Sequence, residues 1–78
     1  MAYNQLQRTA LDSGNMGLDL IEILSHLHYK SDLAITKQIQ AGEISINYQK
    51  VRDIKYVLEP GTYLIAQYGV PFAEVTIL

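Results

Sequence analysis

The side chains best suited to catalysis are few in this chain of 78 residues, and they are not spaced to work together. The two histidines, His26 and His28, lie two residues apart in a stretch with a helical pattern, so they would point about 200° apart around the helix axis. Two histidines that bind one metal from a helix need a spacing of four residues. The absence of cysteine excludes cysteine nucleophiles, disulfides and thiolate zinc sites.

Other arrangements that carry out chemistry are also missing. Gly14 and Gly17 are isolated and precede no strand–helix junction, so they do not form a phosphate-binding loop. The acidic residues are spread singly, and no spacing marks two of them as an acid–base pair. The sequence therefore predicts a protein that is not an enzyme and that uses no metal or other cofactor.

Positive charge and tyrosine gather in one third of the chain. Residues 30–55 contain five of the six Lys and Arg residues and have a net charge of +2, whereas the remainder has a net charge of −4. Tyr29, Tyr48 and Tyr56 lie in or beside this segment. Cations beside aromatic rings are typical of RNA binding, because phosphates meet the cations and unstacked bases meet the rings. Ordinary packing with the hydroxyl toward solvent explains the same tyrosines equally well.

Two short helices are expected, the first beginning at Leu18 and the second covering residues 33–41. Ser31 is a typical N-cap for the second helix, and Gly42 is a typical residue to end it. The connection around residues 29–31 is short, so the two helices should be neighbours. The first helix is expected to carry one amphipathic face, formed by Leu20, Ile21, Leu24, Leu27 and His28.

After Gly42 the apolar period changes from 3.6 to two, which indicates strands. Residues 44–46 alternate as a half-buried strand, and residues 62–67 and 72–77 are expected to form a hairpin. The predicted fold class is α+β, with two short helices packed on a small, mostly antiparallel sheet of four to five strands. The predicted core consists of Leu20, Ile21, Leu24, Leu27, Leu33, Ile39, Ile44, Ile46, Val57, Leu64 and Val75.

The chain is expected to divide into a polar arm, residues 1–17, and one domain, residues 18–78. The arm lacks strong periodicity, so we expect it to be loosely held, with at most one short helical turn. No apolar run approaches the roughly 18 residues that span a bilayer. The N-terminal residues also lack the apolar region of a signal peptide. These features predict a cytoplasmic protein that does not enter membranes.

The segment 30–58 resembles a known RNA-binding family. It reads KSDLAITKQIQAGEISINYQKVRDIKYVL, and it is similar to the alpha-L RNA-binding domain, the "S-four" domain named for small-subunit ribosomal protein four. With the strand-rich remainder, the resemblance is closest to the C-terminal tRNA-contacting domain of tyrosyl-tRNA synthetases. The residues that match the family pattern are Ser31, Ile39, Gly42, Ile44, Ile46, Asn47 and Val51.

The resemblance implies a small non-catalytic module that binds structured RNA such as tRNA or rRNA. The chain departs from the family at Ala34, where the family has Glu, at Thr36, where it has Arg, and at Tyr48, where it has the turn Gly. We therefore expect Asn47 or Tyr48 to adopt a positive φ. About half of the family's cations are missing. The residues expected to contact RNA are Lys30, Lys37, Tyr48, Lys50, Arg52 and Lys55.

Two alternatives remain open from the sequence. The net charge of −2 is opposite in sign to that of most nucleic-acid binders, and the turn at residues 68–71 is uncharged. Both features suit a protein-interaction module, such as a small phage or regulatory protein, that keeps the fold without binding RNA. The domain could also be an appendage of a larger enzyme.

Overall fold

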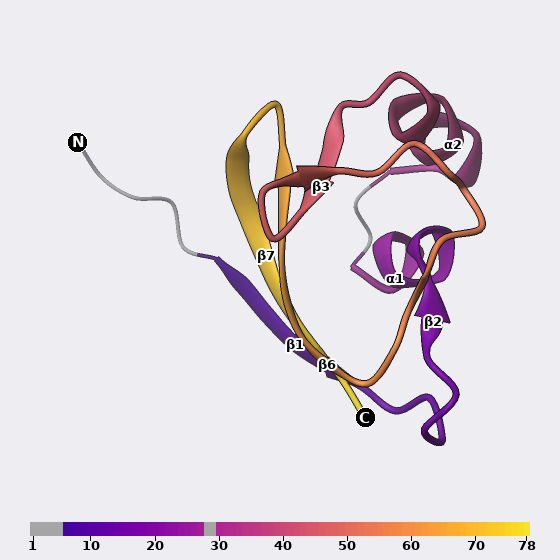
Figure 1. The fold of residues 1–78 in the computed structure, drawn as a ribbon, viewed down its shortest axis with the longest axis vertical. Helices are drawn as coiled ribbons and strands as arrows, with labels where there is room; N and C mark the ends of the chain where they lie inside the picture. Colours follow the sequence, from indigo (N-terminus) through magenta and orange to yellow (C-terminus); the bar gives the residue numbers. More distant parts are fainter. Residues whose placement is uncertain (1–5, 28–29) are drawn as a thin grey trace.

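The computed structural model describes residues 6–27 and 30–78, which form an α+β fold. Two helices, α1 (Leu20–His26) and α2 (Asp32–Gln40), pack on a five-stranded sheet (Figure 1). This arrangement confirms the predicted fold class. The strands of the sheet are β1 (Gln7–Leu11), β3 (Ile44–Ile46), β4 (Gln49–Lys50), β6 (Gly61–Gln67) and β7 (Val70–Ile77).

The order of strands in the sheet is β1-β7-β6-β3-β4, with β7 and β6 near its centre. All neighbouring pairs are antiparallel except β1 and β7, which are parallel. The predicted hairpin is formed by β6 and β7. Two further strands, β2 (Leu18–Asp19) and β5 (Val57–Leu58), form a separate antiparallel pair. The sheet is therefore mostly antiparallel, as the sequence predicted.

The segment expected to be a loosely held arm contains strand β1. Gln7–Leu11 pairs with β7 in continuous register, from Gln7 opposite Ala73 to Leu11 opposite Ile77 (Figure 1). Residues 7–11 form a strand that is held in the sheet, so the expectation of a loosely held arm is wrong for them. The physical reason is the available partner, because β7 offers a full edge of backbone donors and acceptors to this otherwise unmarked segment.

Capping interactions fix where the helices begin and end. At the start of α1, Asp19 Oδ1 accepts from the Glu22 N–H at 2.8 Å, and Glu22 Oε1 accepts from the Asp19 N–H at 3.3 Å. Ser31 Oγ accepts from the Ala34 N–H at 3.3 Å, which confirms the predicted N-cap of α2. After α2, Gly42 has a φ of 77°, the left-handed conformation of a helix end, as expected.

The core lies between the helices and the sheet. The buried stripe of α1 includes Ile23 in place of Ile21, because residues 20, 23, 24 and 27 share one face. Leu33 and Val57 were wrongly placed in the core, since they are 67% and 50% exposed, and Leu64 is only partly buried. Leu33 lies across the helix from the buried stripe of α2, and Val57 alternates with the buried Leu58. The buried apolar residues that the sequence pattern missed are Ile23, Ile35, Leu58, Ile65, Ala66, Ala73 and Ile77.

Tight turns with left-handed backbone close both hairpins. Asn47 and Tyr48 have φ values of 50° and 69°, which confirms the expected positive φ in the turn between β3 and β4. Tyr68 and Gly69 repeat the pattern between β6 and β7, with φ values of 51° and 78°. Positive φ at both central residues is the signature of a type I′ turn. Asn47 is also tied to β6, because its Oδ1 accepts from the Leu64 N–H at 2.9 Å.

Replacing Tyr48 by Gly is expected to raise the free energy of unfolding by up to about 1 kcal/mol. A side chain at positive φ costs roughly 1–2 kcal/mol, and the greater freedom of Gly in the unfolded chain offsets part of that gain. The Tyr48 ring is 72% exposed, so little packing is lost with it. Urea unfolding followed by circular dichroism measures the change. Tyr48→Ala is the control, because it removes the ring but keeps the Cβ, and it should give no such gain.

Candidate nucleic-acid interface

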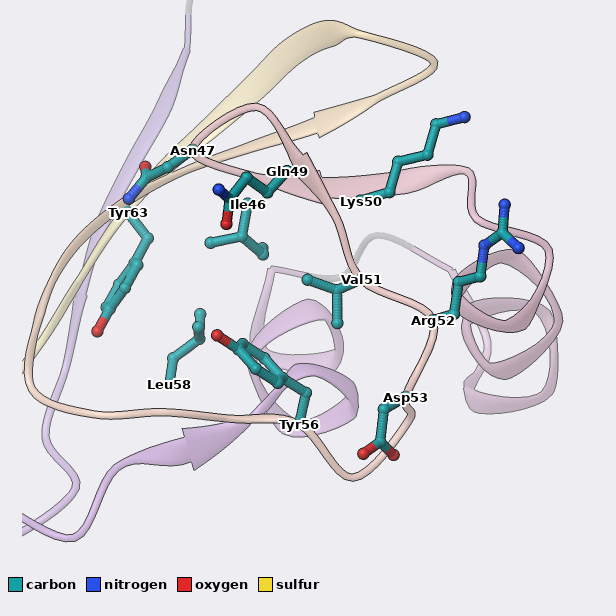
Figure 2. Close-up of a pocket in the computed structure, with 10 residues that line it drawn as sticks. All are labelled: Ile46, Asn47, Gln49, Lys50, Val51, Arg52, Asp53, Tyr56, Leu58 and Tyr63. Carbon is teal, nitrogen blue, oxygen red and sulfur yellow. The ribbon is translucent and has the colours of Figure 1, made fainter.

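A groove of about 380 Å³ opens beside the β3–β4 hairpin (Figure 2). Its floor is apolar, formed by Ile46 from β3, Val51 after β4 and Leu58 from β5. Two tyrosine rings complete it. Tyr63 is fixed, because its hydroxyl donates to the Glu59 carbonyl oxygen at 2.7 Å. Tyr56 is 45% exposed, so part of its ring is accessible for contact with a ligand. We call this site the first groove.

Polar and charged side chains form the rim of the first groove. Asn47 and Gln49 supply amide groups, and Lys50 and Arg52 supply two cations. Figure 2 shows that the Lys50 and Arg52 side chains extend from the same end of the groove. Asp53 contributes one carboxylate, so the charged groups of the lining sum to +1. Neither Lys50 nor Arg52 forms an ion pair with a residue that the structure describes.

Asp53 has a structural role next to these cations. Its Oδ1 accepts from the Lys55 N–H at 2.9 Å, and its carbonyl oxygen accepts from the Tyr56 N–H at 3.0 Å. These bonds form the turn that carries Tyr56 to the groove. The carboxylate is therefore part of the scaffold that positions the ring.

Arg52 lies against the end of helix α2. A Cβ atom added at Gly42 would be 2.7 Å from Arg52 Nε, so the guanidinium packs directly against the Gly42 backbone, where any other residue would place its side chain. Gly42 follows the C-cap Ala41, where the negative end of the helix dipole favours a cation. The glycine that ends α2 thus also makes room for Arg52 at the rim of the first groove.

A second groove, of about 490 Å³, lies on the other side of Lys50. It lies between the end of α2 and the β6–β7 turn, and its polar groups come from Glu43, Ser45, Lys50 and Tyr68. The Glu43 carboxylate accepts a hydrogen bond from the Tyr68 phenol and raises its pKa above the ordinary value. Glu43 balances the charge of Lys50, so this groove is less attractive to phosphate than the first.

The structure brings together two of the six residues predicted to contact RNA. Lys50 and Arg52 both line the first groove, as does Tyr56. The other four line neither groove, although all are exposed. Their positions are before α2 for Lys30, in its last turn for Lys37, at the hairpin tip for Tyr48 and in the following loop for Lys55.

Asn47, Gln49 and Tyr63 line the first groove but were missed as site residues. Strand pairing brings them there, because Gln49 lies opposite Ile46 and Tyr63 belongs to β6 on the far side of β3. The strand alternation of residues 61–67 was the available signal, since it places Tyr63 and Ile65 on one face. His28 and Tyr29, which the sequence also brought forward, lie outside the described residues.

The rest of the described chain adds no metal site or membrane span. Within residues 6–27 and 30–78, no group of three or more His, Asp or Glu side chains is arranged to hold a metal ion. Neither α1 nor α2 has the length and apolar character needed to cross a membrane. Arg8 Nε and Glu74 Oε1 form an ion pair at 3.2 Å between β1 and β7, away from both grooves.

Comparison with known proteins does not assign the chain to a family. A scan against protein-family models finds no match, and a search of curated proteins finds none. The resemblance to the alpha-L RNA-binding domain therefore stays a prediction.

Proposed function

We propose that this chain is a small non-catalytic RNA-binding module of the cytoplasm that contacts structured RNA such as tRNA or rRNA. The observation that carries the proposal is the first groove, which is lined both by the cations Lys50 and Arg52 at one end and by the accessible ring of Tyr56 (Figure 2). Two cations without ion-pair partners among the described residues suit phosphates, and an exposed ring suits an unstacked base. The proposal assigns no catalytic residue and no cofactor.

The salt dependence of binding tests whether phosphates are contacted. Two phosphate contacts are expected to give a slope of log affinity against log salt of about −1.4 to −1.8, and further contacts by Lys30, Lys37 or Lys55 would steepen it to about −4. Fluorescence anisotropy with a labelled RNA stem-loop measures the slope. A flat titration at low salt, with the protein shown to be folded, contradicts the proposal.

Charge reversal at the groove is expected to weaken binding to all RNA sequences alike. Lys50→Glu and Arg52→Glu each remove one phosphate contact and add repulsion, so each should cost about tenfold in affinity or more at low salt. Lys55→Glu is the matched comparison: it makes the same charge change outside both grooves, so it should cost clearly less, because Lys55 can add only a peripheral phosphate contact. Equal losses for Lys50→Glu and Lys55→Glu would show that the groove is not the contact site.

A protein-interaction module is the second candidate, favoured by the tip of the β6–β7 hairpin. Tyr68 and Val70 are 72% and 61% exposed there, with no cation in the turn. Exposed aromatic and apolar groups of this kind are typical of protein contacts. Under this function the RNA titration stays flat, and Val70→Asp abolishes capture of the partner protein while Lys50→Glu leaves it intact.

A further inference from the structure

Strand β1 is the longer of the two edges of the sheet. The strand order places β1 at one edge and β4 at the other. Strand β4 has two residues, whereas β1 has five and pairs with β7 without a break in register. A short edge offers little backbone to another chain, but five extended residues offer a template for a further strand.

The hydrogen bonds at the end of β1 show which backbone groups face outward. The Leu78 N–H donates to the Leu11 carbonyl oxygen at 2.8 Å, so the peptide groups of Leu11 face β7. Along a strand these groups point alternately to the two sides. Thr9 therefore also faces β7, whereas Arg8 and Ala10 present their N–H and C=O groups to the open edge, without a strand partner among the described residues.

Within the part of the chain that the structure describes, β1 lacks the proline and the bulge that commonly protect an edge strand. The strand contains no proline, and its register with β7 shows no bulge. Its one charged residue, Arg8, is paired with Glu74 at 3.2 Å, so the charge is matched within the chain. Native proteins usually prevent edge pairing with unpaired charges, prolines or bulges. The edge of β1 is therefore open to pairing.

We propose that β1 pairs antiparallel with β1 of a second copy of this chain, about a two-fold axis at Thr9. In that register Arg8 of one copy lies opposite Ala10 of the other, and these two residues exchange both of their backbone hydrogen bonds. The two Thr9 residues lie opposite each other. Paired threonines stabilise antiparallel strands, and the small Ala10 leaves room for the Arg8 stem without opposing like charges. Because β1 supplies its own complement, the second copy is the occupant that the strand fits.

The dimer is independent of the proposed RNA contact. Lys50 lies on β4, at the edge of the sheet opposite β1. Pairing through β1 joins the two sheets and leaves the first groove of each copy at the outer edges. RNA binding and dimer formation can therefore fail separately.

Sedimentation velocity over a wide concentration range tests the dimer. The chain is expected to reach twice its mass of 8.8 kDa as concentration rises. Ala10→Pro should abolish the dimer and keep the fold, because it removes an outward N–H that serves no bond inside the sheet. Circular dichroism checks that the variant is folded. The proposal is overturned if the wild-type chain stays monomeric at the highest concentration reached. It is also overturned if the chain binds an extended peptide along β1 but does not dimerise.

A pair of charge variants tests the register even if Ala10→Pro does not fold. Ala10→Glu places a carboxylate opposite Arg8 of the second copy, and Ala10→Lys places a like charge there. Since each change acts twice in a two-fold dimer, Ala10→Glu should dimerise about tenfold more tightly than Ala10→Lys. Equal dissociation constants for these two variants would exclude this register and overturn the proposal.

Discussion

Leu24→Ala is expected to lower the free energy of unfolding by about 2–5 kcal/mol. Leu24 is fully buried in α1, in the core between the helices and the sheet. The substitution removes apolar contacts and leaves a cavity that the surrounding core can only partly fill. A chain of this size has about 4–12 kcal/mol of stability in total, so the variant should be largely unfolded at moderate urea concentrations. Urea titration followed by far-ultraviolet circular dichroism measures the loss.

Leu33→Ala is the matched control for this substitution. It makes the same chemical change in the neighbouring helix, but the Leu33 side chain is 67% exposed. Alanine is the better helix former, so the free energy of unfolding should stay within about 0.5 kcal/mol of the wild type. A loss at Leu33 comparable with that at Leu24 would mean that Leu33 is covered in solution.

Gly17→Ala is expected to lower the free energy of unfolding by more than the roughly 1–2 kcal/mol of backbone strain alone. Gly17 has a φ of 82°, and a Cβ there would lie 2.6 Å from the Leu58 carbonyl oxygen. That oxygen cannot move freely, because Leu58 pairs with Leu18 in the β2–β5 ladder. The alanine must therefore either break this pairing or shift the start of α1, which is capped by Asp19. Thermal unfolding measures the loss.

Gly14→Ala separates the collision from the backbone strain. Gly14 also has a positive φ, 61°, but a Cβ there meets no atom within 4 Å. Only the strain of about 1–2 kcal/mol should appear. If the two alanine variants lose equal stability, the close approach of Gly17 to Leu58 does not occur in solution.

The features that the sequence predicted well are those set by a few neighbouring residues. Ser31 caps a helix because its hydroxyl reaches an N–H three residues away, and Gly42 ends that helix because it tolerates a positive φ. Asn47 signals its turn in the same local way. Such residues determine local geometry wherever they occur, so they can be recognised without knowing the fold.

Strand β1 could not be predicted because its signal is not local. Its partner β7 lies far along the chain, with Arg8 bonded to Glu74 across 66 residues. The segment Gln7–Leu11 has little alternation of apolar and polar residues, since only Leu11 packs against the core. Its strand conformation depends on the open edge that β7 presents, and that edge exists only in the folded sheet.

The candidate site was predicted in part for the same reason. Lys50 and Arg52 were found because cations that cluster along the chain can be counted. Tyr63 joins them only through the pairing of β3 with β6, and the sequence does not state that register. Leu33 and Val57 show the same limit in the core, because an apolar residue has two possible faces and only packing selects one.

The parallel pairing of β1 with β7 has a consequence for how the chain folds during synthesis. Residues 7–11 are synthesised well before their partner strand, residues 70–77. Until β7 is made, β1 has no strand to pair with, and β6 lacks its neighbour on that side of the sheet. Long-range pairing of this kind slows folding, because the intervening chain must be ordered before the contact forms. The helices can form as soon as residues 20–40 are made, but the five-stranded sheet must await β7, and β1 is exposed to other nascent chains in the meantime.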